Sequence, residues 1–241
     1  MLRALREQWW RLHRRWHGAA TAQAIDLQYE GQTLESVFSD IYARGTWGRG
    51  DDGYFSGSGS HDAAITDSYV RAVRSYLRSM PGCPRVVDLG CGDFHIGAQL
   101  VSAAGSYLAC DVVGALIERN RSHFAGLGAD FRQLDIVADA LPRGDVAIIR
   151  QVLQHLSNAE IAEVVPKLHV YPRLIVSEHR PVGLFVRANR DKPHGPGIRL
   201  RQRSMVDITK PPFGFAGHRS RVLHEVPQLG GVIRTTVYER R

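Results

Sequence analysis

Short apolar runs, separated by segments with helical periodicity, recur along the middle and end of this chain. Such runs lie at 86–89, 106–110, 131–135 and 173–177, and another opens the segment 141–156. Strands that alternate with helices predict a doubly wound α/β fold with a mostly parallel sheet, in which ligands bind beyond the carboxyl ends of the strands. Two further runs, 221–226 and 231–238, are close enough in sequence to form an antiparallel hairpin.

Helical periodicity also fills the N-terminal part of the chain. Within 1–18 one face of the expected helix carries Leu2, Leu5, Trp9, Leu12 and Trp16. This segment holds five arginines and one glutamate, a net charge of +4. We expect residues 1–24 to form a basic amphipathic helix that lies on a membrane surface or an anionic partner, or that packs onto the main domain or a second subunit. The main domain then comprises 25–241.

Two helices and a glycine-rich connection are expected before the first strand. The periodicity predicts helices over 25–42 and 63–80, the second one ended by Pro81 and Gly82. The connection 45–61 contains many glycines and reads as a loop. Because it also contains Trp47, Tyr54 and Phe55, which are costly to leave in a disordered linker, we interpret it as a lid or floor over a ligand.

The segment 86–97 carries the strongest local signal. A strand ends in an acidic residue, a Gly-x-Gly turn follows, and an apolar-periodic segment comes next, which predicts a sharp turn from a strand into a helix. Gly90 and Gly92 allow the backbone to approach a ligand, and Asp88 can accept a cationic amine. A dinucleotide-binding turn requires a third glycine where this chain has His95, so that interpretation is disfavoured.

The sequence Asp-Leu-Gly-Cys-Gly at 88–92 resembles motif I of the class I S-adenosylmethionine-dependent methyltransferases, with Phe94 in place of the last glycine of the motif. The resemblance covers about 83–238 and implies a Rossmann-like, seven-stranded sheet whose last strand is antiparallel. It also implies S-adenosylmethionine as the cofactor. The stretch 38–60 is similar to the entry region of a largely uncharacterised bacterial branch of these enzymes, which would put its Ser and Gly residues near the methionine end of the cofactor.

Two further acids follow motif I at the spacing that this resemblance implies. Asp111 ends the second apolar run about 20 residues after the glycines, where a carboxylate binds the ribose hydroxyls. Asp135 matches the position that binds the adenine amino group. Taken singly, each acid could instead be a solvated carboxylate at a strand end. The predicted cofactor-binding residues are Asp88, Gly90, Cys91, Gly92, Asp111, Val112, Asp135, Ile136 and Arg150.

Methyl transfer to a hydroxyl also needs a base near the end of the fourth or fifth strand. His155 follows the fourth strand by about one helical turn, although it could be a packed helix histidine instead. Glu178 and His179 lie at the end of the fifth run, and we expect one of them to bind the acceptor and the other to be solvated. The loop 180–217 should form part of the acceptor pocket. No closed metal-ligand spacing is present, so we predict no metal site, and a divalent ion that acidifies the acceptor hydroxyl is the minority alternative.

Composition restricts the possibilities further. With 241 residues, 44% of them hydrophobic, the chain can bury one sizeable core. No apolar run reaches the length of a transmembrane span, and three cysteines without paired spacing fit a reducing compartment, so we expect a cytoplasmic protein, with peripheral membrane contact left open. The net charge of +7 permits an anionic partner.

We therefore predict an enzyme that methylates a hydroxyl of a small molecule, such as a sugar. A methyltransferase acting on RNA or protein, and a non-catalytic binding module with the same fold, remain alternatives.

Overall fold

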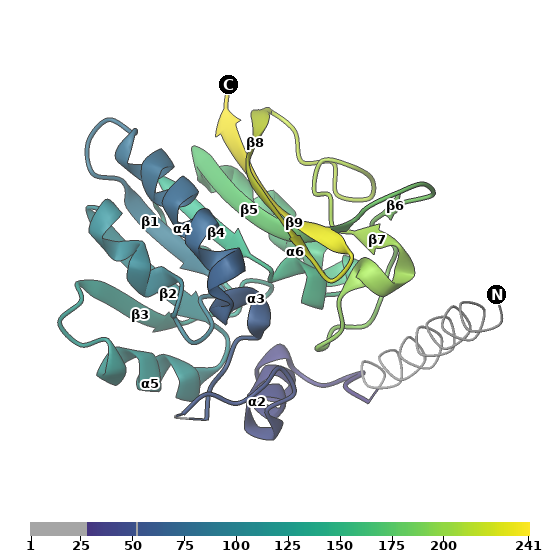
Figure 1. The fold of residues 1–241 in the computed structure, drawn as a ribbon, viewed down its shortest axis with the longest axis horizontal. Coiled ribbons are helices and arrows are strands. Elements are labelled where there is room, and N and C mark those ends of the chain that lie inside the picture. The colour runs from purple at the N-terminus through teal and green to yellow at the C-terminus, as the bar shows by residue number, and fades with distance from the viewer. Residues whose placement is uncertain (1–27, 52) are drawn as a thin grey trace, which may run out of the picture.

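The computed structural model describes residues 28–51 and 53–241, and the predicted helix within 1–24 lies outside them. The main body is a seven-stranded sheet in the order β3-β2-β1-β4-β5-β9-β8 (Figure 1). The strands are β1 Arg85–Leu89, β2 Ser106–Asp111, β3 Ala129–Gln133, β4 Val146–Arg150, β5 Arg173–Pro181, β8 His218–Gln228 and β9 Gly231–Arg240.

Strands β1 to β5 pair in parallel, and β9 runs antiparallel to both β5 and β8. The predicted doubly wound sheet with an antiparallel last strand is confirmed, and so is the hairpin of β8 and β9. In space β9 lies between β5 and β8, so that β8 forms the edge of the sheet.

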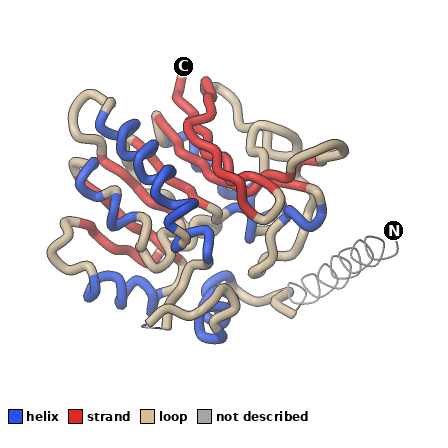
Figure 2. Tube along the Cα trace, viewed as in Figure 1, coloured by secondary structure: helices blue, strands red, loops and turns tan. Residues whose placement is uncertain are grey.

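Alternate residues of the central strands supply two hydrophobic cores, one on each face of the sheet. Val86, Ile148 and Ile175 pack with the helix α4 (Ala63–Arg78), while Val87, Ile149 and Leu174 pack with the helix α6 (Asn158–Lys167). Figure 2 shows α4 across one face of the sheet. The remaining longer helices are α2 Leu34–Arg44 and α5 Gly114–His123. Burial on both faces explains why these strands read as nearly continuous apolar runs.

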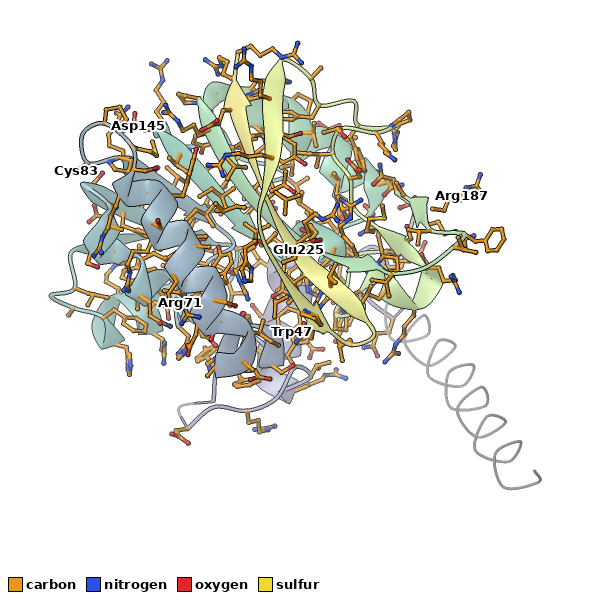
Figure 3. The ribbon with its side chains drawn as sticks, turned by 45° about the horizontal axis from the view of Figure 1, so that its top comes forward. Trp47, Arg71, Cys83, Asp145, Arg187 and Glu225 are labelled. Carbon is orange, nitrogen blue, oxygen red and sulfur yellow. The ribbon has the colours of Figure 1, made fainter. Side chains whose placement is uncertain are left out.

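The amino and carboxyl ends of the parallel strands lie at opposite ends of the molecule. Cys83 and Asp145 precede β1 and β4, and Figure 3 shows them at the end of the molecule away from Trp47. The carboxyl ends of the parallel strands therefore point toward the side occupied by Trp47 and α2. That side is where a doubly wound sheet binds its ligands.

Three predicted elements differ from the structure. In the described residues from 28 onward, the helix expected over 25–42 begins at Leu34, because Gly31 adopts a left-handed conformation (φ 79°) and the Thr33 hydroxyl caps the helix by accepting the Ser36 N–H. The expected helix after β1 is replaced by two short 3-10 helices, Gly97–Gln99 and Val101–Ala103. The glycine-rich loop 45–61 contains one helical turn, α3 Ser58–His61.

The segment 180–217 is more ordered than the predicted loop. It begins inside β5, continues through β6 Arg187–Ala188, a 3-10 turn Arg199–Gln202 and β7 Ser204–Met205, and β6 pairs in parallel with β7. Arg199 is almost completely buried and donates hydrogen bonds to the carbonyl oxygens of Leu153 (3.2 Å), Gln154 (3.0 Å) and Leu156 (2.8 Å). This arginine fastens the segment to the turn that comes after β4.

Candidate active site

A cavity of about 1640 Å³ lies beyond the carboxyl ends of the parallel strands. It is large enough for a nucleoside together with a second small molecule. All the residues that the sequence predicted to bind a cofactor line this cavity, namely Asp88, Gly90, Cys91, Gly92, Asp111, Val112, Asp135, Ile136 and Arg150. The predicted bases His155 and His179 line it as well, whereas Glu178 does not.

The glycine turn after β1 needs both of its glycines. Gly90 and Gly92 have φ values of 84° and 57°, in the left-handed region that residues with a Cβ avoid. A Cβ at Gly90 would lie 2.4 Å from Cγ2 of Val152, and one at Gly92 would lie 2.4 Å from Oγ of Ser56. The turn therefore brings three separate segments of the chain together at the floor of the cavity.

Asp111, at the end of β2, is held against this turn. Its Oδ2 accepts the N–H of Gly92 (3.0 Å) and its Oδ1 accepts the N–H of Val113 (3.1 Å). Burial raises the pKa of this carboxyl, and the backbone N–H groups oppose that shift. Each carboxylate oxygen keeps a further lone pair, so Asp111 can still accept hydrogen bonds from a diol in the cavity.

Asp88 lies deeper, at the end of β1. Its Oδ2 accepts the hydroxyl proton of Tyr107 (2.8 Å). Burial raises the pKa of Asp88 to about 7, a shift to which the nearby Asp111 adds and which Tyr107 and Arg150 oppose. A carboxyl group in this condition gains most by meeting a cationic group of a ligand.

Asp135 lies two residues beyond β3, where its Oδ1 accepts the N–H of Val137 at 2.8 Å. Its neighbours Leu134 and Ile136 are buried and line the cavity. A flat heteroaromatic ring fits between apolar walls of this kind, with the carboxylate at its edge.

The connection 45–61 closes over the glycine turn through a reciprocal pair of hydrogen bonds. The N–H of Ser56 donates to Oδ2 of Asp93 (2.7 Å), and the N–H of Asp93 donates to Oγ of Ser56 (2.9 Å). Oδ2 of Asp93 also lies 2.6 Å from Nε2 of His61. The serines and glycines at 56–60 line the cavity, as expected for the predicted lid or floor.

Arg150 ends β4 at the cavity, and Gln151 follows it. The Arg150 guanidinium donates to Oγ of Ser60 (2.9 Å) and lies 4.8 Å from the centre of the Tyr69 ring. Its Nε is buried and has no hydrogen-bond partner within the described part of the chain. Gln151 has a φ of 58°, and such strain in a residue with a side chain is typical of functional sites.

His155 follows β4 in the 3-10 turn Leu153–His155 and contacts the rings of Trp47 (5.0 Å) and Phe38 (6.4 Å). Its Nδ1 donates to the carbonyl oxygen of Gly195 (3.2 Å), so Nε2 is the ring nitrogen that carries no proton. The amide nitrogen of Gln154 is 3.4 Å from Nε2. Burial, with Lys192 adding to its effect, lowers the pKa of His155 to about 3, so the ring is neutral.

His179 has both ring nitrogens occupied. Its Nδ1 lies 3.1 Å from the Gln151 amide nitrogen and 3.0 Å from the Gln154 amide oxygen, and its Nε2 lies 2.5 Å from the Gln228 amide oxygen. Burial lowers the pKa of His179. Three glutamine amides therefore fix this ring in place.

Glu178 points to the opposite face of the sheet. It lines only a second, much smaller cavity, and its Oε1 accepts the N–H of Leu153 (3.1 Å). Burial raises the pKa of Glu178 to about 8. The expectation that Glu178 or His179 is solvated is wrong, because β5 continues through both residues and buries them on opposite faces.

Sequence reasoning missed two polar residues that hold the turn. Asp93 joins the lid, and Asn120 is completely buried and donates from Nδ2 to the carbonyl oxygen of Gly92 (2.7 Å). A signal for Asn120 was present, because it lies three to four residues after Leu116 and Ile117 and so on the apolar face of α5.

Residues 28–51 and 53–241 contain no group of three or more His, Cys, Asp and Glu side chains that could hold a metal ion. None of the helices formed by this part of the chain has the length and apolar character that crossing a bilayer requires.

Comparisons with known proteins agree with this geometry. No protein-family model matches the sequence, and no curated protein resembles it significantly. Magnesium protoporphyrin IX methyltransferase (ChlM) from Synechocystis with bound SAM is 18% identical, with a TM-score of 0.57 over 91% of this chain and 97% of that protein. Human N-acetylserotonin methyltransferase with SAM is 16% identical, with a TM-score of 0.56 over 94% of this chain and 66% of that protein.

A third similar structure is the N-terminal domain of EvdMO1, determined in the presence of SAH and D-fucose. It is 15% identical, with a TM-score of 0.50 over 72% of this chain and 83% of that domain. All three resemble this chain in fold, yet they share less than a fifth of its residues. The chain has the fold of the class I S-adenosylmethionine-dependent methyltransferases.

Proposed function

We propose that this protein is an S-adenosylmethionine-dependent methyltransferase that acts on a hydroxyl group of a small molecule, such as a sugar. One observation carries the proposal: the glycine turn and the three strand-end carboxylates Asp88, Asp111 and Asp135, chosen from the sequence alone, all line a single cavity. Similar structures crystallised with SAM or SAH support the same cofactor.

The residues in the cavity fit this cofactor. Asp111 would bind the ribose hydroxyls, since its two oxygens are held in place by backbone N–H groups. Asp135 and Ile136 would hold the adenine ring, and Asp88 would bind the methionine ammonium. Gly90 and Gly92 line the cavity, and a side chain at either would disturb the turn by meeting Val152 or Ser56.

When bound, the cofactor supplies a methyl group on a sulfonium, which an acceptor oxygen displaces in line with the departing sulfur. This chain must then orient the acceptor hydroxyl and take its proton. We assign the proton to Nε2 of His155, because Nδ1 of that ring donates to Gly195 and fixes the tautomer. The aromatic contacts with Trp47 and Phe38 hold the ring in position and exclude water.

A small-molecule acceptor is favoured by what the similar enzymes are named for, magnesium protoporphyrin IX in one and N-acetylserotonin in another. The cavity of this chain also has room beyond the predicted cofactor residues, where it is lined by Trp47, His155, His179 and Pro196. His155 and Trp47 would therefore contact the acceptor.

An RNA or protein acceptor is the second candidate, and one observation favours it. The side chains of Arg201 and Arg203, both on the exposed side of the 3-10 turn, line the mouth of the cavity. Arginines at such a position can bind a polyanion. RNA binding that weakens steeply with salt, together with methylation of RNA, would favour this alternative.

The proposed function is tested by methyl transfer from radiolabelled S-adenosylmethionine to a panel of sugars and small hydroxylated aromatic compounds. Transfer to at least one hydroxyl, and its loss in His155→Ala with cofactor affinity retained, is the expected result. Full transfer by His155→Ala would remove this histidine from the proton-accepting role. Binding of the cofactor without transfer to any small molecule, RNA or protein would favour a non-catalytic binding module.

A further inference from the structure

An exposed apolar rim lies beside the mouth of the cavity. We define it as Val182, Leu184, Phe185 and Leu229, whose exposed fractions are 58%, 76%, 89% and 71%. These are the four most exposed of the large hydrophobic residues in the described part of the chain. Hydrophobic side chains gathered at such exposure mark an interaction surface.

Strand pairing brings the two parts of the rim together. Pro181, at the end of β5, pairs with Gly231, at the start of β9, so the segment after Pro181 lies beside the turn that contains Leu229. The guanidinium of Arg203 donates to the carbonyl oxygen of Leu184. Figure 1 shows the connection between β5 and β6 projecting from the body of the molecule. Val182, Leu184 and Phe185 therefore lie on a projecting connection, and Leu229 lies in the turn between β8 and β9.

Positive charge surrounds the rim. Within 180–206 the side chains of Arg187, Arg190, Arg201 and Arg203 are exposed or partly exposed. The single acid in that segment, Asp191, accepts the N–H groups of Asn158 and Lys192 through its Oδ1, both at 2.8 Å. Figure 3 shows Arg187 at the edge of the molecule. Arginines therefore outnumber acids in this segment.

We propose that this rim docks on an anionic phospholipid bilayer. Leu184 and Phe185 would enter the boundary between headgroups and acyl chains, and the arginines would contact the phosphates. RNA would attract the arginines equally, but it offers no apolar phase for Val182, Leu184 and Leu229. A surface rich in arginines also suits a second copy of the chain poorly, because the arginines of the two copies would repel each other.

Docking in this way would turn the cavity toward the membrane. The lining of the cavity includes Leu229, which belongs to the rim, together with Gln228, Arg201 and Arg203. If the proposed methyl transfer is correct, an amphiphilic acceptor could enter from the bilayer with its polar end first. The docking itself does not depend on that activity.

The test is co-sedimentation of the full chain with phosphatidylcholine vesicles, with and without phosphatidylglycerol. We expect binding to the anionic vesicles, and a partition coefficient at least about tenfold lower in the double variant Leu184→Ser/Phe185→Ser. The matched control, Leu127→Ser/Val170→Ser, changes exposed apolar residues that precede β3 and β5 at the other end of the sheet and should bind like the wild type. Arg187→Gln should weaken binding to anionic vesicles only.

Each outcome bears on the proposal separately from the enzyme activity. Circular dichroism and S-adenosylhomocysteine binding of the double variant should equal those of the wild type, because Leu184 and Phe185 do not line the cavity. Wild-type protein that ignores anionic vesicles, or a double variant that binds them unchanged, would overturn the proposal. RNA binding that the arginine variant weakens and the apolar variant does not, without vesicle binding, would identify RNA as the partner instead.

Discussion

Ser56 and Asp93 bind each other twice: the Ser56 N–H donates to the Asp93 carboxylate at 2.7 Å, and the Asp93 N–H donates to the Ser56 hydroxyl at 2.9 Å. These residues are 37 positions apart in the sequence, one in the glycine-rich connection and the other in the turn after β1. The pair fastens the predicted lid to the floor of the cavity. Tyr42, whose hydroxyl lies 3.0 Å from the Ser56 hydroxyl, extends the link to α2.

Ser56→Ala should loosen this lid. The variant leaves the buried N–H of Asp93 without its acceptor, so we expect the free energy of unfolding to fall by about 1–3 kcal/mol and S-adenosylhomocysteine to bind more weakly. Urea denaturation and calorimetric titration measure the two effects. Ser36→Ala is the control, since the Ser36 hydroxyl is exposed and should contribute little. If Ser56→Ala and the wild type bind S-adenosylhomocysteine with equal affinity, the Ser56–Asp93 pair does not contribute to ligand binding.

Cofactor affinity should depend on pH through Asp88. Because burial raises the pKa of Asp88 to about 7, this carboxyl is mostly protonated below that pH, and a ligand ammonium must displace the proton. Affinity for S-adenosylhomocysteine should therefore fall by up to about tenfold per unit as pH decreases below 7. The Asp88→Asn variant keeps an acceptor for the Tyr107 hydroxyl. It should bind S-adenosylhomocysteine more weakly than the wild type at high pH, and its affinity should not change with pH. A flat wild-type profile across neutral pH would contradict this assignment.

His155→Ala should reduce turnover by about 10²–10⁴-fold, the usual contribution of a general base, with little effect on cofactor affinity. His123→Ala, which removes an exposed histidine at the end of α5, is the matched control. Since burial holds the pKa of His155 near 3, its protonation should not limit the rate near neutral pH. The Asp88→Asn variant removes the titration of Asp88 from the pH profile of the rate. If the rate of this variant falls with protonation of a group whose pKa is about 6.5, the ordinary value of a histidine, the base is a residue other than His155.

Glu178 should make the protein less stable as pH rises. Its pKa is about 8 in the folded chain against 4.5 when unfolded, so between these values the folded chain holds a proton that the unfolded chain releases. The free energy of unfolding is then highest below pH 4.5 as far as Glu178 is concerned, and it decreases by up to about 1.4 kcal/mol per pH unit until pH 8. Glu178→Gln should remove this slope in urea denaturation series, and an unchanged slope would show that other groups cause it.

The strand-end acids could be found from the sequence because parallel strands end at one edge of a sheet. Acids that follow the apolar runs of neighbouring parallel strands are expected at the same edge of the sheet, so Asp88, Asp111 and Asp135 could be placed together without knowledge of their contacts. Gly90 and Gly92 follow from the same reasoning, since the turn after the first strand requires left-handed backbone. These are local or topological constraints that short sequence patterns carry.

The conformation of Phe94 could not be predicted from such local patterns. It occupies the place of a motif glycine and still adopts a φ of 63°, with its ring buried against Tyr107, Phe124 and Phe131 at centroid distances of 5.6, 5.1 and 4.8 Å. A Cβ at Gly97 would lie 2.2 Å from this ring. The packing that compensates the backbone strain comes from three other parts of the chain, which no local pattern reveals. The prediction of a regular helix there is therefore wrong.

Glu178 and His179 illustrate a different limit. The apolar run suggested that β5 ends at Ser177, which would place both residues in a loop at the tip of the strand. Pairing with β9 continues through Pro181, so the two side chains alternate between the faces of the sheet. The length of a strand depends on its partner, and the partner of β5 is a distant segment of the sequence, Gly231–Arg240.

Calorimetric titration of the full chain with S-adenosylhomocysteine shows whether the cavity binds this nucleoside and whether Asp111 contributes. We expect one molecule to bind per chain, with affinity reduced at least about tenfold in Asp111→Ala, which loses the proposed ribose acceptor. Glu118→Ala, which removes an exposed acid of α5, should bind as the wild type does. Absence of binding by the wild type, or undiminished binding by Asp111→Ala, would contradict the account.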